Sequence, residues 1–96
     1  MNKVVREGLV AVIVSEGYGA GWSTWNKAED AFEPEVVRWI EGGKVGEPLK
    51  EGDDRYAGGL EEARIVWLPV GTLFRIDEYD GSESLVTHEE EEYMQC

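Results

Sequence analysis

The chain has 96 residues, which is enough for one folded domain and too few for two independent cores. Hydrophobic residues make up 42% of it, and this ordinary share argues against wholesale disorder. The formal net charge of −12 predicts a surface that repels phosphate groups, so we expect no direct binding to DNA or RNA.

The cysteine content favours a reducing compartment, and the hydropathy of the chain favours a protein outside the membrane. The single cysteine, Cys96, has no partner for a disulfide within the chain and no metal-ligand spacing around it. No apolar stretch is long enough to span a membrane, and the N-terminus lacks the pattern of a signal peptide. We therefore expect a cytoplasmic protein without membrane association.

The first elements in the chain are predicted to be strands, over residues 3–6 and 9–15, with a break at Glu7 and Gly8. The run from Leu9 to Val14 is continuously apolar and rich in β-branched side chains. Such a run is typical of a central strand that is buried on both faces.

A glycine-rich loop is predicted next, over residues 17–26, with the sequence GYGAGWSTWN. Alternating glycines permit positive φ and close approach to a neighbour, and successive N–H groups in such a loop can bind an anion. The aromatic side chains between them could stack on a planar ring. The loop has the spacing of neither a Walker motif nor a dinucleotide-binding motif.

Two interpretations of this glycine loop stay open. In one, it is a tight loop whose aromatic side chains fold back onto the core. In the other, it binds a small nucleotide-like ligand. The ligand-binding residues of this second hypothesis are Tyr18, Gly19, Gly21, Trp22, Ser23, Trp25, Asn26 and Lys27, with Arg75 as a further candidate.

A short helix is predicted over Pro34–Glu41. Pro34 suits the first helical position, where its missing N–H has no intrahelical partner to lose. The apolar residues of this segment share one face, and two glycines after Glu41 end the helix. Residues 44–60, rich in glycine and charged residues, form a long connection.

The C-terminal half is predicted to form strands over residues 63–68 and 72–79. Asp80-Gly81 is a strong signal for a two-residue hairpin turn, and it pairs Tyr79 with Ser82.

The same register fixes two other pairs in this hairpin. It places Ile76 opposite Leu85 on the apolar face, and Glu78 opposite Glu83. Because like charges directly opposite each other are unfavourable, we expect these two glutamates at an exposed end.

Catalytic and metal-binding patterns are missing from the sequence. His88 is the single histidine, without a second histidine or a nearby cysteine, and we expect it at the surface. Arg75 shares a strand face with Asp77 and Tyr79, which fits a binding residue or an ordinary ion pair. We therefore predict no metal site, no cofactor and no enzymatic activity.

The acidic residues are concentrated at the C-terminus. Residues 77–96 hold eight acidic residues and no lysine or arginine, including the run Glu89-Glu90-Glu91-Glu92. We predict one α+β domain over residues 1–88 and an acidic tail over residues 89–96.

Within this domain we expect a mainly antiparallel sheet of about four or five strands with the helix packed on it. The helix residues Val37, Trp39 and Ile40 should meet strand residues in one core. These strand residues are Val12, Val14, Trp67, Phe74 and Ile76.

Residues 10–26 and 66–85, which contain GYGAGWSTWN and FRIDEYDGSESL, resemble a family of small uncharacterised proteins of tailed bacteriophages. The family has no assigned activity, so no functional residue is carried over from it. The resemblance implies a phage accessory protein that acts against a host factor or a host defence system.

Two functions from different classes are compatible with this context. The first is a binding protein that sequesters a small nucleotide-like ligand in the glycine loop, with a symmetric homo-oligomer to bury the ligand. The alternative is an acidic stoichiometric inhibitor that docks on a basic, nucleic-acid-binding site of a host protein. A structural phage protein is a third possibility.

Overall fold

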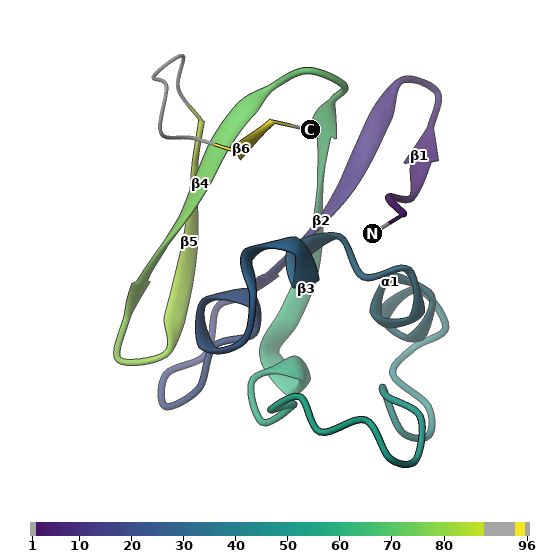
Figure 1. Cartoon of the computed structure of the whole chain (residues 1–96), viewed down its shortest axis with the longest axis vertical. Coiled ribbons are helices and arrows are strands. Elements are labelled where there is room, and N and C mark those ends of the chain that lie inside the picture. Colours follow the sequence, from purple (N-terminus) through teal and green to yellow (C-terminus); the bar gives the residue numbers. More distant parts are fainter. Residues whose placement is uncertain (1, 88–93, 96) are drawn as a thin grey trace.

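The computed structural model describes residues 2–87 and 94–95 (Figure 1). These residues form six strands, one α-helix and three short 3-10 helices. In chain order they are β1 (Val5–Arg6), β2 (Leu9–Ser15), η1 (Ser23–Trp25), η2 (Ala28–Phe32), α1 (Pro34–Glu41), η3 (Leu60–Glu62), β3 (Ala63–Pro69), β4 (Leu73–Tyr79), β5 (Ser82–Thr87) and β6 (Met94–Gln95).

The strands form two antiparallel sheets with the orders β1-β2-β3 and β5-β4-β6. The α+β class, the antiparallel pairing and the helix Pro34–Glu41 are confirmed, but the strands are divided between two sheets. In Figure 1 the β4–β5 hairpin lies on one side of β2 and β3, and α1 lies on the other.

Strand β2 is buried on both faces, as its apolar run predicts. Ala11 and Ile13 face a core cluster that includes α1, whereas the even-numbered valines from Val10 to Val14 face Phe74 and η2. The expectation that the helix meets Val12, Val14, Phe74 and Ile76 is therefore wrong, whereas Trp67 packs in the cluster of the helix as expected. Successive side chains of a strand point to opposite faces, so β2 separates two clusters where one core was expected.

The β4–β5 hairpin has the predicted register, with Tyr79 opposite Ser82 and Glu78 opposite Glu83. Its turn residues Asp80 and Gly81 have φ values of 49° and 85°, the left-handed region that a tight two-residue hairpin turn requires. The expected exposure holds for Glu78 but is wrong for Glu83, which is only 2% exposed.

The last strand, β6, pairs with β4 through Leu73 opposite Gln95 and Phe74 opposite Met94. Residues 94–95 of the predicted tail therefore pair with the sheet of β4. His88 and the run Glu89–Glu92 lie outside the described residues. In the described part of the chain, no helix has the length and apolar character needed to cross a membrane.

Candidate functional site

The glycine loop closes around a buried carboxylate, that of Glu83 on β5. One oxygen accepts a hydrogen bond from Ser15 N at 2.9 Å. The other accepts from Trp22 N at 2.8 Å, Thr24 N at 3.1 Å and Thr24 Oγ1 at 2.6 Å. Because all four groups are donors, they solvate a buried charge in place of water. The loop does present N–H groups to an anion, and this anion is the protein's own Glu83.

Glycines let the neighbouring segments approach this loop closely. A Cβ atom on Gly21 would lie 2.5 Å from Thr24 Oγ1 and 2.9 Å from a Glu83 oxygen. A Cβ atom on Gly59 would lie 2.6 Å from Ala20 O, and one on Gly81 would meet Ala20 N. The close packing of Thr24 and Glu83 against Gly21 thus explains the need for glycine at this position, and no ligand is required.

Trp22 and Ser23, two of the candidate ligand-binding residues, are buried. The Trp22 indole donates a hydrogen bond to Asp30 O at 2.7 Å, and its ring packs in the cluster that contains α1. Trp22 therefore offers no free face to a ligand. At this residue the structure matches the interpretation in which the loop aromatics fold back onto the core.

Asn26 joins the glycine loop to the long connection after α1. Its Nδ2 donates to Trp22 O at 2.8 Å and to Tyr56 O at 2.9 Å, and its Oδ1 accepts from Tyr56 N at 2.9 Å. The neighbouring Lys27 has an exposed side chain, and its backbone N–H donates to Asp30 Oδ2 at 3.0 Å. The side chain of Asn26 thus holds the backbone at Tyr56 in place.

Arg55, which the sequence patterns did not single out, is enclosed by three carboxylates. Its guanidinium contacts Asp53 at 2.6 Å, Asp30 at 2.8 Å and Glu33 at 2.8 Å. Side-chain hydrogen bonds from Arg55 lower the pKa of Asp53 to about 2. The hydrogen bond with Asp53 is also the main cause that raises the pKa of Arg55. Asp30 and Glu33 lie more than twenty residues before Arg55 in the chain, so no local spacing in the sequence predicts this cluster.

Four large aromatic side chains are exposed, and three segments of the chain contribute them. Tyr18 is 76% exposed, Trp25 44%, Tyr56 50% and Tyr79 78%. We call Tyr18, Trp25, Tyr56 and Tyr79 the aromatic surface. The rings of Trp25 and Tyr56 stack with centroids 5.4 Å apart and planes inclined by 25°.

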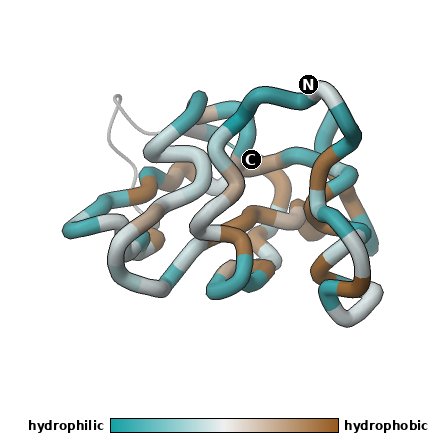
Figure 2. Tube along the Cα trace, turned by 90° about the horizontal axis from the view of Figure 1, so that it is seen from below, coloured by the Kyte–Doolittle hydropathy of each residue, from teal (hydrophilic) through white to brown (hydrophobic). Residues whose placement is uncertain are grey.

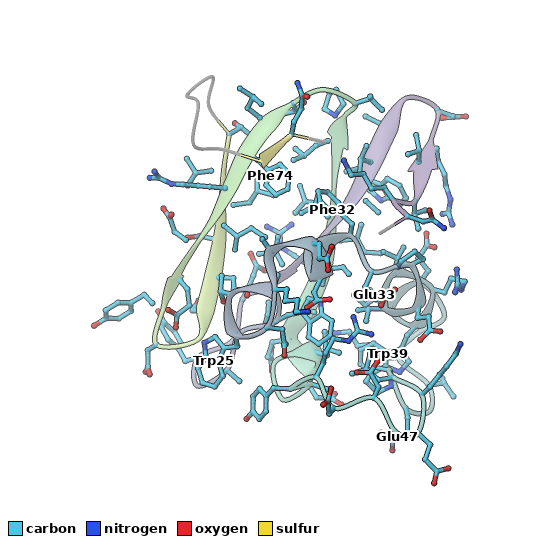
Figure 3. All side chains as sticks on the ribbon, viewed as in Figure 1. Trp25, Phe32, Glu33, Trp39, Glu47 and Phe74 are labelled. Atoms are coloured by element: carbon cyan, nitrogen blue, oxygen red, sulfur yellow. The ribbon has the colours of Figure 1, made fainter. Side chains whose placement is uncertain are left out.

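Hydrogen bonds hold the segments of the aromatic surface together. Trp25 Nε1 donates to a Glu78 oxygen at 3.2 Å, and Figure 3 shows Trp25 beside the turn between β4 and β5. Gly19 N donates to Asp80 O at 2.5 Å, which brings Tyr18 and Tyr79 to neighbouring positions on either side of this contact. The surface thus combines the glycine loop, the hairpin turn and the segment at Tyr56.

Carboxylates surround this end of the molecule. Glu78 and Asp80 are exposed at the hairpin turn, which is hydrophilic at the left of Figure 2. Beside Trp25 and Tyr56 lies an open hollow of about 560 Å³. Its lining residues are Asn26, Lys27, Glu29, Asp30, Asp53, Asp54 and Arg55. With four acidic and two basic side chains in this lining, the hollow suits a cation better than a phosphate.

Arg75 forms an ion pair with Asp77 on the same strand, with Nε and Oδ1 2.9 Å apart. Both side chains are about half exposed, which matches the ion-pair interpretation and gives a contact of small energetic value.

Among the described residues, no group of three or more His, Cys, Asp or Glu is arranged to hold a metal ion. Searches of protein-family models, of curated proteins and of solved structures each gave no significant match to this chain.

Proposed function

We propose that this protein is a binding protein whose aromatic surface docks on a basic site of another protein. The observation that carries the proposal is the occupation of the loop's anion site by Glu83, with Trp22 buried behind it. The backbone N–H groups of Trp22 and Thr24, the Trp22 indole and the Asn26 amide all make hydrogen bonds within the protein. The aromatic side chains that stay exposed belong to the glycine loop, the hairpin turn and the segment at Tyr56, which hydrogen bonds join.

Exposed aromatic rings are a specific signal for protein recognition. Trp and Tyr dominate the binding energy of protein interfaces, because each buries a large area while ordering few rotatable bonds. The rings of Trp25 and Tyr56 stack on each other, Asn26 bonds the Tyr56 backbone, and Glu78 accepts a hydrogen bond from the Trp25 indole. A surface that is fixed before binding loses little conformational entropy when a partner docks.

The net negative charge of the chain favours a partner with a basic surface. A net charge of −12 attracts a basic protein surface over long distances and repels nucleic acid. In a phage accessory protein, which the sequence resembles, such a partner would be a host protein with a nucleic-acid-binding site in the host cytoplasm. The acidic surface would compete with nucleic acid for this site.

Binding of a small nucleotide has weaker support from the geometry. Of the candidate residues, Trp22 and Ser23 are buried and Asn26 already makes hydrogen bonds through both atoms of its amide. Lys27 lies at a hollow that also contains four carboxylates. We therefore treat a bound nucleotide as the outcome that would refute the proposal.

The proposal is tested by recovering the tagged protein from infected host cells as wild type, as Tyr79→Ala and as Val45→Ala. Val45 is as exposed as Tyr79 but lies in the connection after α1, so it is the matched control. We expect one host protein to be retained by wild type and Val45→Ala, and lost from Tyr79→Ala. Equal retention by all three proteins would contradict the proposal.

A further inference from the structure

Three of the four tryptophans have a cation from their own chain over the ring. Arg55 lies 5.3 Å from the ring centre of Trp22, Arg6 lies 5.4 Å from Trp67, and Lys44 lies 5.9 Å from Trp39. Trp25 instead stacks on Tyr56 and remains 44% exposed. Cation–π contact is therefore a recurrent use of tryptophan in this fold, and Trp25 is the tryptophan that presents its ring to an external group.

Hydrogen bonds join the segments that carry the stacked pair. Asn26 makes two hydrogen bonds to the backbone of Tyr56 and one to Trp22 O. Glu78 accepts a hydrogen bond from the Trp25 indole at 3.2 Å, and the same oxygen accepts from Gly81 N at 2.7 Å. The two stacked rings thus form a platform that is joined to the glycine loop and to the hairpin turn.

One carboxylate contacts this platform, and a second belongs to the segment that carries Tyr56. Glu78 lies at the indole edge of Trp25. Asp54 is exposed, precedes Tyr56 by two residues and lines the acidic hollow. A cation placed over the rings would therefore meet the carboxylate of Glu78 at the indole edge, which strengthens a cation–π contact.

The Arg55 site shows the same combination inside the protein. There, a guanidinium lies over the Trp22 ring while Asp30 and Asp53 accept its hydrogen bonds. A guanidinium suits this geometry better than an ammonium, because it is planar, stacks on aromatic rings and bonds carboxylates in pairs.

We infer that the Trp25–Tyr56 platform binds an arginine side chain of a basic partner segment, with Glu78 and Asp54 as its carboxylate partners. This inference rests on the proposed function, and it specifies a guanidinium as the group of the partner that contacts the platform. The platform is the centre of the docking surface, and the remaining acidic residues attract the partner without selecting arginine over lysine.

The inference is tested with two synthetic nonapeptides, Gly-Ser-Arg repeated three times and Gly-Ser-Lys repeated three times. The peptides carry equal charge, so a preference between them reports the guanidinium. Binding is followed in low salt through the indole N–H signals of the ¹⁵N-labelled protein, with the Trp25 signal assigned from Trp25→Phe. We expect the arginine peptide to bind about tenfold more tightly and to shift the Trp25 signal most.

Two variants separate the platform from general acidity. Tyr56→Ala should remove most of the preference for arginine, and Asp54→Asn should reduce it while leaving the platform folded. Ser84→Ala, a change at an exposed residue of β5, should keep the full preference. A thermal melt of each variant shows that the fold is intact.

The outcomes also distinguish this inference from the proposed function. Equal binding of both peptides without a shift of the Trp25 signal would overturn the arginine site. If a host protein is still lost from Tyr79→Ala in that case, the proposed function stands on other contacts. If no host protein is retained by the wild type either, both proposals fail.

Discussion

A single residue, Glu83, accepts the hydrogen bonds that hold the glycine loop in its conformation. Its carboxylate accepts hydrogen bonds from Ser15, Trp22 and Thr24, which come from β2 and from the glycine loop. A buried N–H group without an acceptor costs about 1–3 kcal/mol. The loop conformation therefore depends on a residue that lies about sixty positions further along the chain.

Replacement of Glu83 by Ala should destabilise the fold strongly. Three backbone N–H groups and one hydroxyl would lose their acceptor, so we expect the free energy of unfolding to fall by about 3 kcal/mol or more. Urea denaturation followed by tryptophan fluorescence measures this loss. Ser84→Ala, an exposed change on the same strand, should alter stability by less than about 0.5 kcal/mol. A loss below about 1 kcal/mol for Glu83→Ala would contradict the assigned role.

At the scale of the elements, local sequence patterns predict those features that local interactions determine. The Asp80-Gly81 turn fixes the register of β4 and β5, and Pro34 with the following glycines fixes the ends of α1. The division into two sheets depends on contacts between segments far apart in sequence. No local pattern tells which face of β2 receives the helix, because both faces are apolar.

Phe74 joins the hairpin to the second core cluster. It is fully buried, and its ring meets Phe32 edge to face with centroids 5.8 Å apart. We expect Phe74→Ala to lower the free energy of unfolding by about 3–5 kcal/mol, since the cavity adds to the lost transfer energy. Ile76→Ala, at a partly buried position of the same strand, should cost less. An equal or smaller loss for Phe74→Ala in chemical denaturation would show that this packing is misassigned.

The Arg55 cluster connects η2, the start of α1 and the long connection, and it should make stability depend on acid pH. Asp53 has a pKa of about 2 in the folded protein against an ordinary value of 3.8. Because the folded state lowers this pKa, the carboxylate stabilises the fold above about pH 4. This contribution is lost as the pH falls from about 4 to about 2.

A carbon-detected NMR titration of the Asp53 carboxyl group checks this pKa directly. Wild type should titrate near pH 2, and Arg55→Gln should raise the midpoint toward 3.8 because the hydrogen bonds that lower it are lost. Arg38→Gln, a change at an exposed arginine of α1, is the control and should leave the midpoint unchanged. A wild-type midpoint near 3.8 would contradict the cluster geometry.

At the scale of the whole molecule, the sequence alone does not tell which aromatic side chains of the glycine loop are buried and which are exposed. Trp22 and Trp25 lie in the same ten-residue loop, and nothing local distinguishes them. Trp22 is buried because Asp30 O and Arg55 meet it from other segments, whereas Trp25 points outward beside Tyr56. Tyr56 and Tyr79 lie far from the glycine loop in the sequence, and only the folded structure brings their segments to it.

The charge of the molecule should govern association with its partner. The acidic surface attracts a basic site, and at 0.1 M ionic strength salt largely screens exposed charges that lie more than about 10 Å apart. We expect the affinity for a captured partner to fall by at least about tenfold between 0.05 M and 0.5 M NaCl, mainly through slower association. Surface plasmon resonance measures both rates. An affinity independent of salt would argue against electrostatic docking.

Native mass spectrometry of the protein purified from infected cells tests the docking proposal most directly. We expect a complex with one host protein that dissociates at high salt, and no small molecule retained by the free protein. A symmetric oligomer that carries a bound nucleotide, without a host protein, would contradict the proposal and return the function to small-ligand binding.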